Sequence, residues 1–159
     1  MIMRINLNNI KKCKYKLRKA SIKDSDFLFF LRNEKNARKN FFSTASINKK
    51  DHKKYLEKEL NNKSTIILVM YKNSDRIGMV RYNLDDIFAH VSICIEKKSR
   101  SLGYGATALE ASETYLKKST IIVAKVKKKN KSSINIFLKN KFKIFLNKKH
   151  FTLIKILRK

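Results

Sequence analysis

The chain has 159 residues, 43% of them hydrophobic, which is enough to bury a core as one domain and excludes a disordered tail. Its formal net charge of +27 comes from 39 basic residues, mostly lysine and spread along the whole sequence, against 12 acidic residues. Base readout favours the arginine fork over the lysine point charge, so we expect solvated surface charge and no nucleic-acid partner.

The first half of the sequence predicts a short basic lead-in over residues 1–14 and a single domain over residues 15–159. The expected elements are a strand at Tyr15–Ala20, a helix capped by Asp24 or Ser25 and ending near Asn33, a short helical or irregular piece at Asn36–Phe42, and a helix at Lys49–Leu60 capped by Asn48. The last helix has His52, Tyr55, Leu56 and Leu60 on one face.

The second half predicts a mixed α/β (α+β) sheet. Three strands joined by short polar turns form an antiparallel meander, and a crossover through a helix makes the next strand a parallel neighbour. In chain order these are strands Ser64–Tyr71, Arg76–Leu84 and Phe88–Ile95, helix Thr107–Lys117, the continuous apolar strand Ile121–Val126, helix Ser132–Asn140, and strands Phe142–Leu146 and Phe151–Leu157.

Location and metal content follow from what the sequence lacks. The longest apolar run, Ile66–Met70 with its flanks, is far too short to span a bilayer, and residues 1–14 carry no apolar segment typical of a secretion signal. Cys13 and Cys94 match no zinc or redox spacing. We therefore expect a cytoplasmic protein with free thiols, no bound metal and no membrane partner.

Two of the three glycines stand two residues apart, at Gly103 and Gly105, although average usage would place about 11 glycines in a chain of this length. They lie between the alternating strand Phe88–Ile95 and the following helix. A glycine turn between a strand and a helix offers free backbone amides and the positive end of a helix dipole, so the segment Arg100–Ala106 predicts a phosphate-binding turn. A turn that merely packs the helix on the sheet is the alternative.

The sequence resembles the GNAT superfamily of acetyl-CoA-dependent N-acetyltransferases over about residues 15–145. The first family motif, Arg/Gln-x-x-Gly-x-Gly/Ala between a strand and a helix, is matched by Arg100, Gly103 and Gly105. A second pattern is matched downstream by Asn130, Ser133, Ile134, Phe137 and Phe142. Either motif alone is weak, but both occur in the right order with the right elements between them.

The resemblance implies acetyl-CoA as the donor. In the family, the strand before the glycine turn splays from its parallel neighbour, the pantetheine arm lies in the gap, and backbone groups polarise the thioester carbonyl. The residues this assigns to the cofactor are Ile93, Cys94, Ile95, Arg100, Ser101, Leu102, Gly103, Tyr104, Gly105, Ala106, Asn130 and Ser133. Arg100, Lys97 and Lys98 are expected to add positive charge near the phosphates.

His90 is the expected catalytic base, because many relatives carry a glutamate at this strand position that removes a proton from the attacking amine. A half-buried structural histidine is the alternative. Cys94 is not expected to act as a nucleophile, since the family transfers acetyl directly in a ternary complex. Phe137 replaces the tyrosine that often protonates the leaving thiolate; Tyr104, Tyr115 or a water are possible substitutes, and a poorly active acyl-CoA binder is the alternative.

The acceptor is expected to be a primary amine, most closely as in relatives that acetylate nucleotide-linked amino sugars of pseudaminic-acid-type pathways. Arginines would pair with the diphosphate, and Phe41 or Tyr82 would stack on the base or sugar. The expected acceptor residues are Arg32, Asn33, Arg38, Phe41, His52 and Arg81. Protein N-terminal acetylation and a basic nucleic-acid-binding protein remain the alternatives, and a homodimer is possible.

Overall fold

A computed structural model describes residues 15–118 and 120–157 of the chain, so the basic lead-in expected at residues 1–14 lies outside the described residues. The strands are β1 (Tyr15–Lys19), β2 (Thr65–Lys72), β3 (Asp75–Asp85), β4 (Phe88–Ile95), β5 (Ile121–Val126), β6 (Lys143–Asn147) and β7 (Phe151–Ile156). The helices are η2 (Ile22–Asp24), α1 (Ser25–Asn33), α2 (Lys35–Asn40), α3 (Lys49–Leu60), η3 (Lys97–Ser99), α4 (Tyr104–Ser112), η4 (Glu113–Tyr115) and α5 (Lys131–Lys139).

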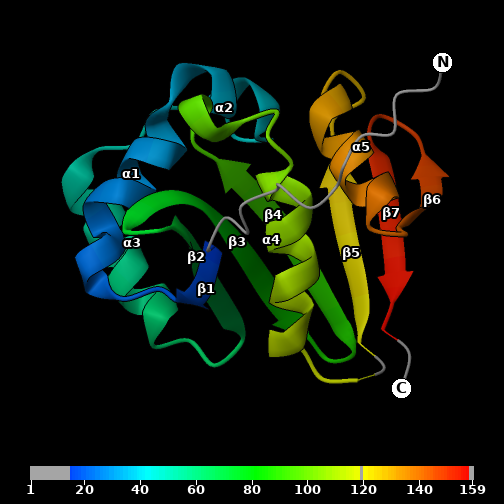
Figure 1. Cartoon of the computed structure of the whole chain (residues 1–159), viewed down its shortest axis with the longest axis horizontal. Helices are drawn as coiled ribbons and strands as arrows, with labels where there is room; N and C mark the ends of the chain where they lie inside the picture. Colours follow the sequence, from blue (N-terminus) through cyan, green and yellow to red (C-terminus); the bar gives the residue numbers. More distant parts are fainter. Residues whose placement is uncertain (1–14, 119, 158–159) are drawn as a thin grey trace, which may run out of the picture.

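The strands form one mixed sheet in the order β1-β2-β3-β4-β5-β7-β6 (Figure 1). Strands β1 to β4 are antiparallel, β4 and β5 are parallel, and β5, β7 and β6 are again antiparallel. The predicted meander, the parallel crossover and the mixed α/β class are confirmed. The parallel pair lies in the middle of the sheet, where α4 connects its two strands.

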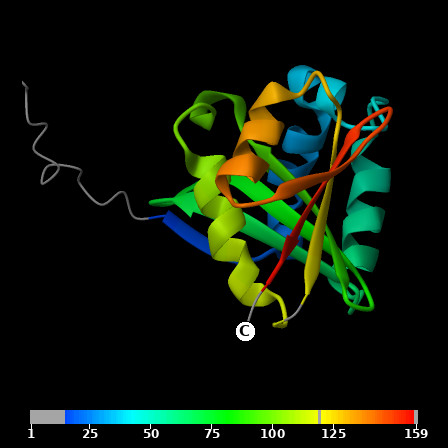
Figure 2. The same ribbon diagram turned by 90° about the vertical axis from the view of Figure 1, so that its right-hand side faces the viewer.

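Helices cover the sheet on both faces (Figure 2). Alternate residues of β2 point to opposite sides, and all of Ile67–Met70 is buried. Leu68 and Met70 belong to the main core with α4 and α5, whereas Ile67 and Val69 pack against Leu28 of α1 and Leu56 of α3. The buried residues of the main core are Leu68, Met70, Ile77, Val80, Tyr82, Ala89, Val91, Ala108, Leu109, Ile122, Ala124, Val126, Ile134, Phe137, Phe142 and Leu153.

Three details of the predicted elements are wrong. Helix α4 begins at Tyr104 rather than Thr107, because Gly103 adopts φ 83° and is itself the N-cap, and it gives way to η4 before Lys117. Tyr55 does not share the buried face of α3; it is 45% exposed, with its hydroxyl against Arg81. Asp24 is the N-cap residue of α1 as predicted, but its side chain makes no capping bond to α1 and is fully buried against two arginines.

Candidate active site

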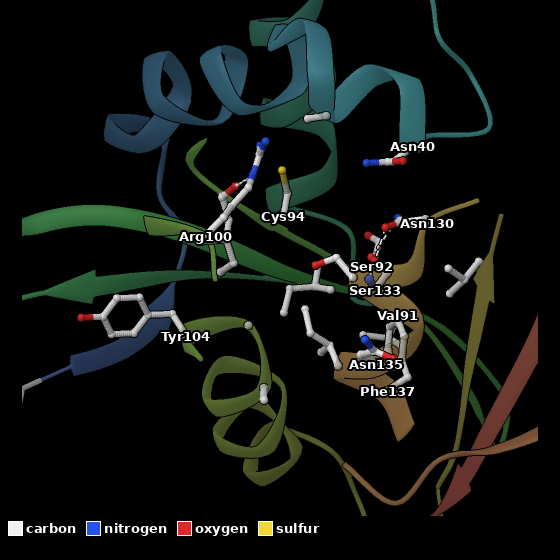
Figure 3. Close-up of a pocket in the computed structure, with 18 of the residues that line it drawn as sticks. Asn40, Val91, Ser92, Cys94, Arg100, Tyr104, Asn130, Ser133, Asn135 and Phe137 are labelled. Atoms are coloured by element: carbon white, nitrogen blue, oxygen red, sulfur yellow. Dashed lines mark hydrogen bonds between the residues drawn. The ribbon is translucent and has the colours of Figure 1, made fainter. Parts of the chain in front are cut away.

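The central parallel pair is split at one end. Strands β4 and β5 pair only at Phe88↔Ile121, Ala89↔Ile122 and His90↔Val123, although β4 runs on to Ile95 and β5 to Val126. A cavity of about 420 Å³ lies at the split. Residues of β4, the glycine turn, β5 and α5 line it from both sides (Figure 3). The opening is therefore built by two neighbouring strands that diverge.

Backbone groups of β4 point into this opening. The Glu96 amide donates to the Ile77 carbonyl of β3 at 2.9 Å. Since backbone polarity alternates along a strand, the N–H and C=O groups of Ile93 and Ile95 point the other way, towards β5. The pairing with β5 has already ended there, so these groups face the cavity, except the Ile95 carbonyl, which accepts a hydrogen bond from Arg100 Nε. They can hold a peptide-like ligand or the oxygen of a polarised carbonyl.

The two glycines of the turn serve different needs. Gly103 has φ 83°, and a Cβ there would meet nothing within 4 Å, so glycine is needed for the left-handed backbone. A Cβ on Gly105 would come within 2.6 Å of Ile136 Cδ1, so glycine there lets α4 pack against α5. Gly103 therefore belongs to the turn, whereas Gly105 lies inside α4. The turn still presents the N-terminus of α4, the positive end of its helix dipole, to the cavity.

Arg100 is a brace rather than a free phosphate ligand. Its Nε donates to the Ile95 carbonyl at 2.8 Å, and its Nη2 pairs with Glu34 Oε2 at 2.6 Å. Glu34 also accepts bonds from the Asn36 and Ala37 amides and so caps α2. Burial raises the pKa of Glu34, but the hydrogen bonds from Arg100 and Asn36 outweigh burial, so the pKa lies below its ordinary value. Arg100 lines the cavity, but its charge is already paired.

The second motif builds the opposite wall. Asn130 Oδ1 accepts from the Ser133 amide at 3.2 Å, and Asn130 Nδ2 donates to Ser133 Oγ at 2.9 Å, so the motif is the N-terminal cap of α5. Both residues line the cavity opposite Arg100 and Cys94 (Figure 3). Phe137, on the same helix, also lines it and packs edge-on to Phe142 at 5.0 Å between ring centroids.

These features agree with known proteins. The sequence matches the family described as "Acetyltransferase (GNAT) domain" over residues 14–143. The chain belongs to the GNAT acetyltransferase family. No curated protein sequence matches this acetyltransferase at a significant level.

Solved structures share the fold at low identity. A spermidine N-acetyltransferase from Vibrio cholerae in complex with CoA and spermine is 16% identical, with a TM-score of 0.78 over 90% of this chain and 95% of that chain. The PaiA N-acetyltransferase from Thermoplasma acidophilum in complex with coenzyme A is 20% identical, with a TM-score of 0.73 over 90% and 99%. RimL, a ribosomal L7/L12 alpha-N-protein acetyltransferase, is 14% identical, with a TM-score of 0.74 over 89% and 90%. Since their named acceptors differ, the fold alone does not identify an acceptor.

Most of the expected cofactor residues of this GNAT acetyltransferase are brought together. Eleven of the twelve line the cavity, the exception being Leu102, which is 62% exposed on the turn. The thiol of Cys94 lies among Leu31 and Ala37, towards α2, and burial raises its pKa to about 11. A thiol in that state is a poor nucleophile at neutral pH.

His90 lies at the closed end of the split, at the last position where β4 pairs with β5. It is half-buried and is not among the residues lining the cavity. Its neighbours Ala89 and Val91 face the α4–α5 core, so the imidazole is on the other face of the sheet, the face that α1 and α3 cover further along. Asn83 of β3 and Val123 of β5 are its cross-strand neighbours.

The expected acceptor arginines hold a loop. Arg32 Nη2 donates to the Ser43 carbonyl at 3.1 Å, and Arg38 Nη1 donates to the Thr44 carbonyl at 3.4 Å. The Asn33 side chain bonds both backbone groups of Ile47, at 2.8 and 3.0 Å. These residues do not line the cavity; they tie the connection between α2 and α3 to α1 and α2.

The remaining expected acceptor residues pack against other parts of the protein, although the buried Nδ1 of His52 has no hydrogen-bond partner among the described residues. Phe41 lines the cavity beneath the Arg32 guanidinium, 5.1 Å from its ring centroid. His52 is buried edge-on to Phe29, and burial together with the Arg32 charge lowers its pKa. Arg81 pairs with Glu59 at 2.8 Å. Tyr82, the other expected stacking residue, is fully buried on the α4 side, with its hydroxyl 2.6 Å from Ser112 Oγ.

Sequence reasoning missed several lining residues, of which Phe42 and Lys125 are the most informative. Phe42 is 58% exposed at the cavity, with the His150 ring 5.2 Å away. Lys125 is the single charged residue in the strand that the sequence predicts to be continuously apolar, and this lone charge is the sequence feature that indicates a site residue. Within residues 15–118 and 120–157, no cluster of side chains fit to hold a metal is found, and no helix is long and apolar enough to cross a membrane.

Proposed function

We propose that this acetyltransferase moves the acetyl group of acetyl-CoA to the primary amine of a nucleotide-activated amino sugar, in a ternary complex. The observation that carries the proposal is the charge of the cavity. Its charged lining residues are Lys125 and Lys139, together with Arg100, whose charge is paired with Glu34, and none of the residues lining it is Asp or Glu. A polyamine or a free peptide amine needs acidic partners, whereas a diphosphate needs basic ones.

The donor end follows from the backbone. The N-terminus of α4 suits the pyrophosphate of coenzyme A, and the pantetheine arm fits between the diverging strands. The thioester carbonyl then lies against the inward-facing amides of Ile93 and Ile95, which stabilise the negative oxygen that develops during attack. These amides also bind the carbonyl oxygen of the unreacted thioester. They lower the barrier only to the extent that they bind the oxyanion of the transition state more strongly.

The acceptor end lies beyond the split, on the face that carries His90. His90 takes a proton from the amine, the nitrogen attacks the thioester carbon, and the tetrahedral intermediate collapses with cleavage of the C–S bond. Coenzyme A leaves as the thiolate, and the amide product forms. The Cys94 thiol takes no part, because its raised pKa keeps it protonated.

His90→Gln tests the base. Glutamine keeps a hydrogen-bonding side chain but accepts no proton, so we expect kcat to fall by about 100-fold or more while acetyl-CoA affinity stays unchanged. Steady-state kinetics together with a thermal-shift titration of acetyl-CoA separate the two effects. Full activity of the variant across pH would remove His90 from the mechanism and leave a water or the free amine itself in its place.

Phe137→Tyr tests the leaving group. Phe137 is 3% exposed, lines the cavity and carries no proton. A phenol at this position would protonate the departing thiolate, so we expect kcat to rise about threefold to tenfold. Phe142→Tyr, which alters the neighbouring ring, is the control. Unchanged kcat in a folded Phe137→Tyr protein would mean that thiolate departure does not limit turnover.

The function itself is tested by CoA release with UDP- and dTDP-linked amino sugars beside N-terminal peptides. Turnover of the nucleotide sugars alone is the expected result. Turnover of peptides alone would replace the proposed acceptor with a protein N-terminus. Failure to bind acetyl-CoA in a thermal-shift titration would overturn the donor as well.

A further inference from the structure

We infer that Lys125 is the counter-ion of an anion subsite for the acceptor, an inference that rests on the proposed function for the identity of the amine. Lys125 is the one exposed residue of β5 and lines the cavity where β5 leaves β4. Its neighbours Ala124 and Val126 are buried in the α4–α5 core. The Lys125 side chain therefore projects from the opposite face, the face of His90.

The register sets the spacing between this charge and the base. Val123 pairs directly with His90, and Lys125 follows two residues later, about 7 Å further along β5. On β7, Thr152 lies opposite Lys125, and Ile154 lies opposite Val123. The surface is therefore polar near Lys125 and apolar near Val123, the residue that pairs with His90. An acceptor that reaches both groups carries its anionic group roughly one sugar ring from its amine.

The charge of Lys125 is not cancelled locally. Among residues 15–118 and 120–157, no salt bridge of Lys125 occurs, whereas Arg81 and Arg100 at the same end of the molecule are paired with Glu59 and Glu34. All 12 acidic residues of the chain lie at or before Glu113, so β5, β6, β7 and α5 carry none. An anion with two or more acceptor oxygens, such as a phosphate or diphosphate, suits this position.

Binding of UDP to the CoA-saturated protein is the first test, because it needs no turnover. Calorimetry is expected to show binding that Lys125→Gln weakens about tenfold and Lys125→Arg retains. Lys129→Gln, which removes the same charge from an exposed residue outside the cavity, is the matched control and should bind like the parent protein. Lys125→Gln binding UDP as tightly as the parent, or no UDP binding by the CoA-saturated parent, overturns the subsite.

Kinetics with a UDP-linked amino sugar and the uncharged methyl glycoside of the same sugar form the second test. Lys125→Gln should raise KM about tenfold for the UDP-linked sugar only, with kcat within twofold. If neither sugar is acetylated but UDP binding depends on Lys125, the amino-sugar proposal fails and the anion subsite stands. If both sugars are acetylated and Lys125→Gln changes neither KM, the amino-sugar proposal stands and the subsite falls.

Discussion

Replacing Asp24 with alanine is expected to lower the free energy of unfolding by about 3–5 kcal/mol, the cost of removing one partner from a buried ion pair. The Asp24 side chain is fully buried. Its carboxylate accepts from Arg18 Nη1 and Nη2 at 2.9 Å each, from Arg76 Nε at 2.8 Å and from the Ser21 amide at 2.8 Å. Without the carboxylate, the Arg18 and Arg76 guanidinium groups are left close together with no negative partner, and β1 and β3 lose the bonds that tie them to the η2 turn.

Chemical denaturation followed by circular dichroism measures the Asp24→Ala loss. Asp26→Asn is the control, because the Asp26 side chain is 78% exposed and pairs with Lys49 at the surface, so it should change stability little. Equal destabilisation by the two substitutions would contradict a special role for the buried carboxylate.

The acid limb of stability follows from the same group. Burial raises the pKa of Asp24, but bonds from Arg18, Ser21 and Arg76 outweigh it and lower the pKa from 3.8 to about 2. Because the folded pKa lies below the unfolded one, the contribution is complete above about pH 4 and is lost as the pH falls through 2. The free energy of unfolding of the parent protein, measured by denaturation, should fall steeply with decreasing pH over that window, and that of Asp24→Asn should not.

Breaking the Arg100–Glu34 brace is expected to raise KM for acetyl-CoA by about tenfold. Arg100 holds the Ile95 carbonyl with one nitrogen and the α2 cap residue Glu34 with another, so it connects the donor wall to the helix above the cavity. Losing a charge-assisted bond of this kind costs about 1.5–3 kcal/mol. We expect part of that loss to weaken acetyl-CoA binding, because the backbone of β4 is then no longer held in its aligned position.

A double-mutant cycle separates this brace from direct phosphate binding. If the pair acts as a unit, Arg100→Gln, Glu34→Gln and the double variant raise the KM for acetyl-CoA by similar factors. If Arg100 instead contacts the phosphates, Glu34→Gln leaves KM unchanged and Arg100→Gln alone raises it. Lys129→Gln, at an exposed residue outside the cavity, is the control for general loss of positive charge.

Local pattern carried most of the fold. The three strands of the meander and the Asn48 cap of α3 depend on neighbours within a few residues, and each is present as predicted. The glycine turn was found by its sequence alone, but its helix start was misplaced. Gly105 looked like part of the turn, whereas only its packing against Ile136 shows that it belongs inside α4.

For the site residues too, the sequence shows the charge of a side chain but not the groups that the fold places beside it. The arginines at positions 32 and 38 were expected to bind an acceptor because their charge is visible in the sequence, but the loop carbonyls that they hold are not. Lys125 was overlooked inside an apolar strand, because only the parting of β4 and β5 exposes it.

The sequence by itself determined the element order, the glycine turn and the family, since these rest on local periodicity, backbone freedom and short motifs. The tertiary structure alone decided which charges are free. Arg100 and Glu34 are 66 positions apart, and Arg76 and Asp24 are 52 apart. A charged side chain has the same composition whether it is paired or not, so its availability to a ligand is decided only by what the fold places beside it.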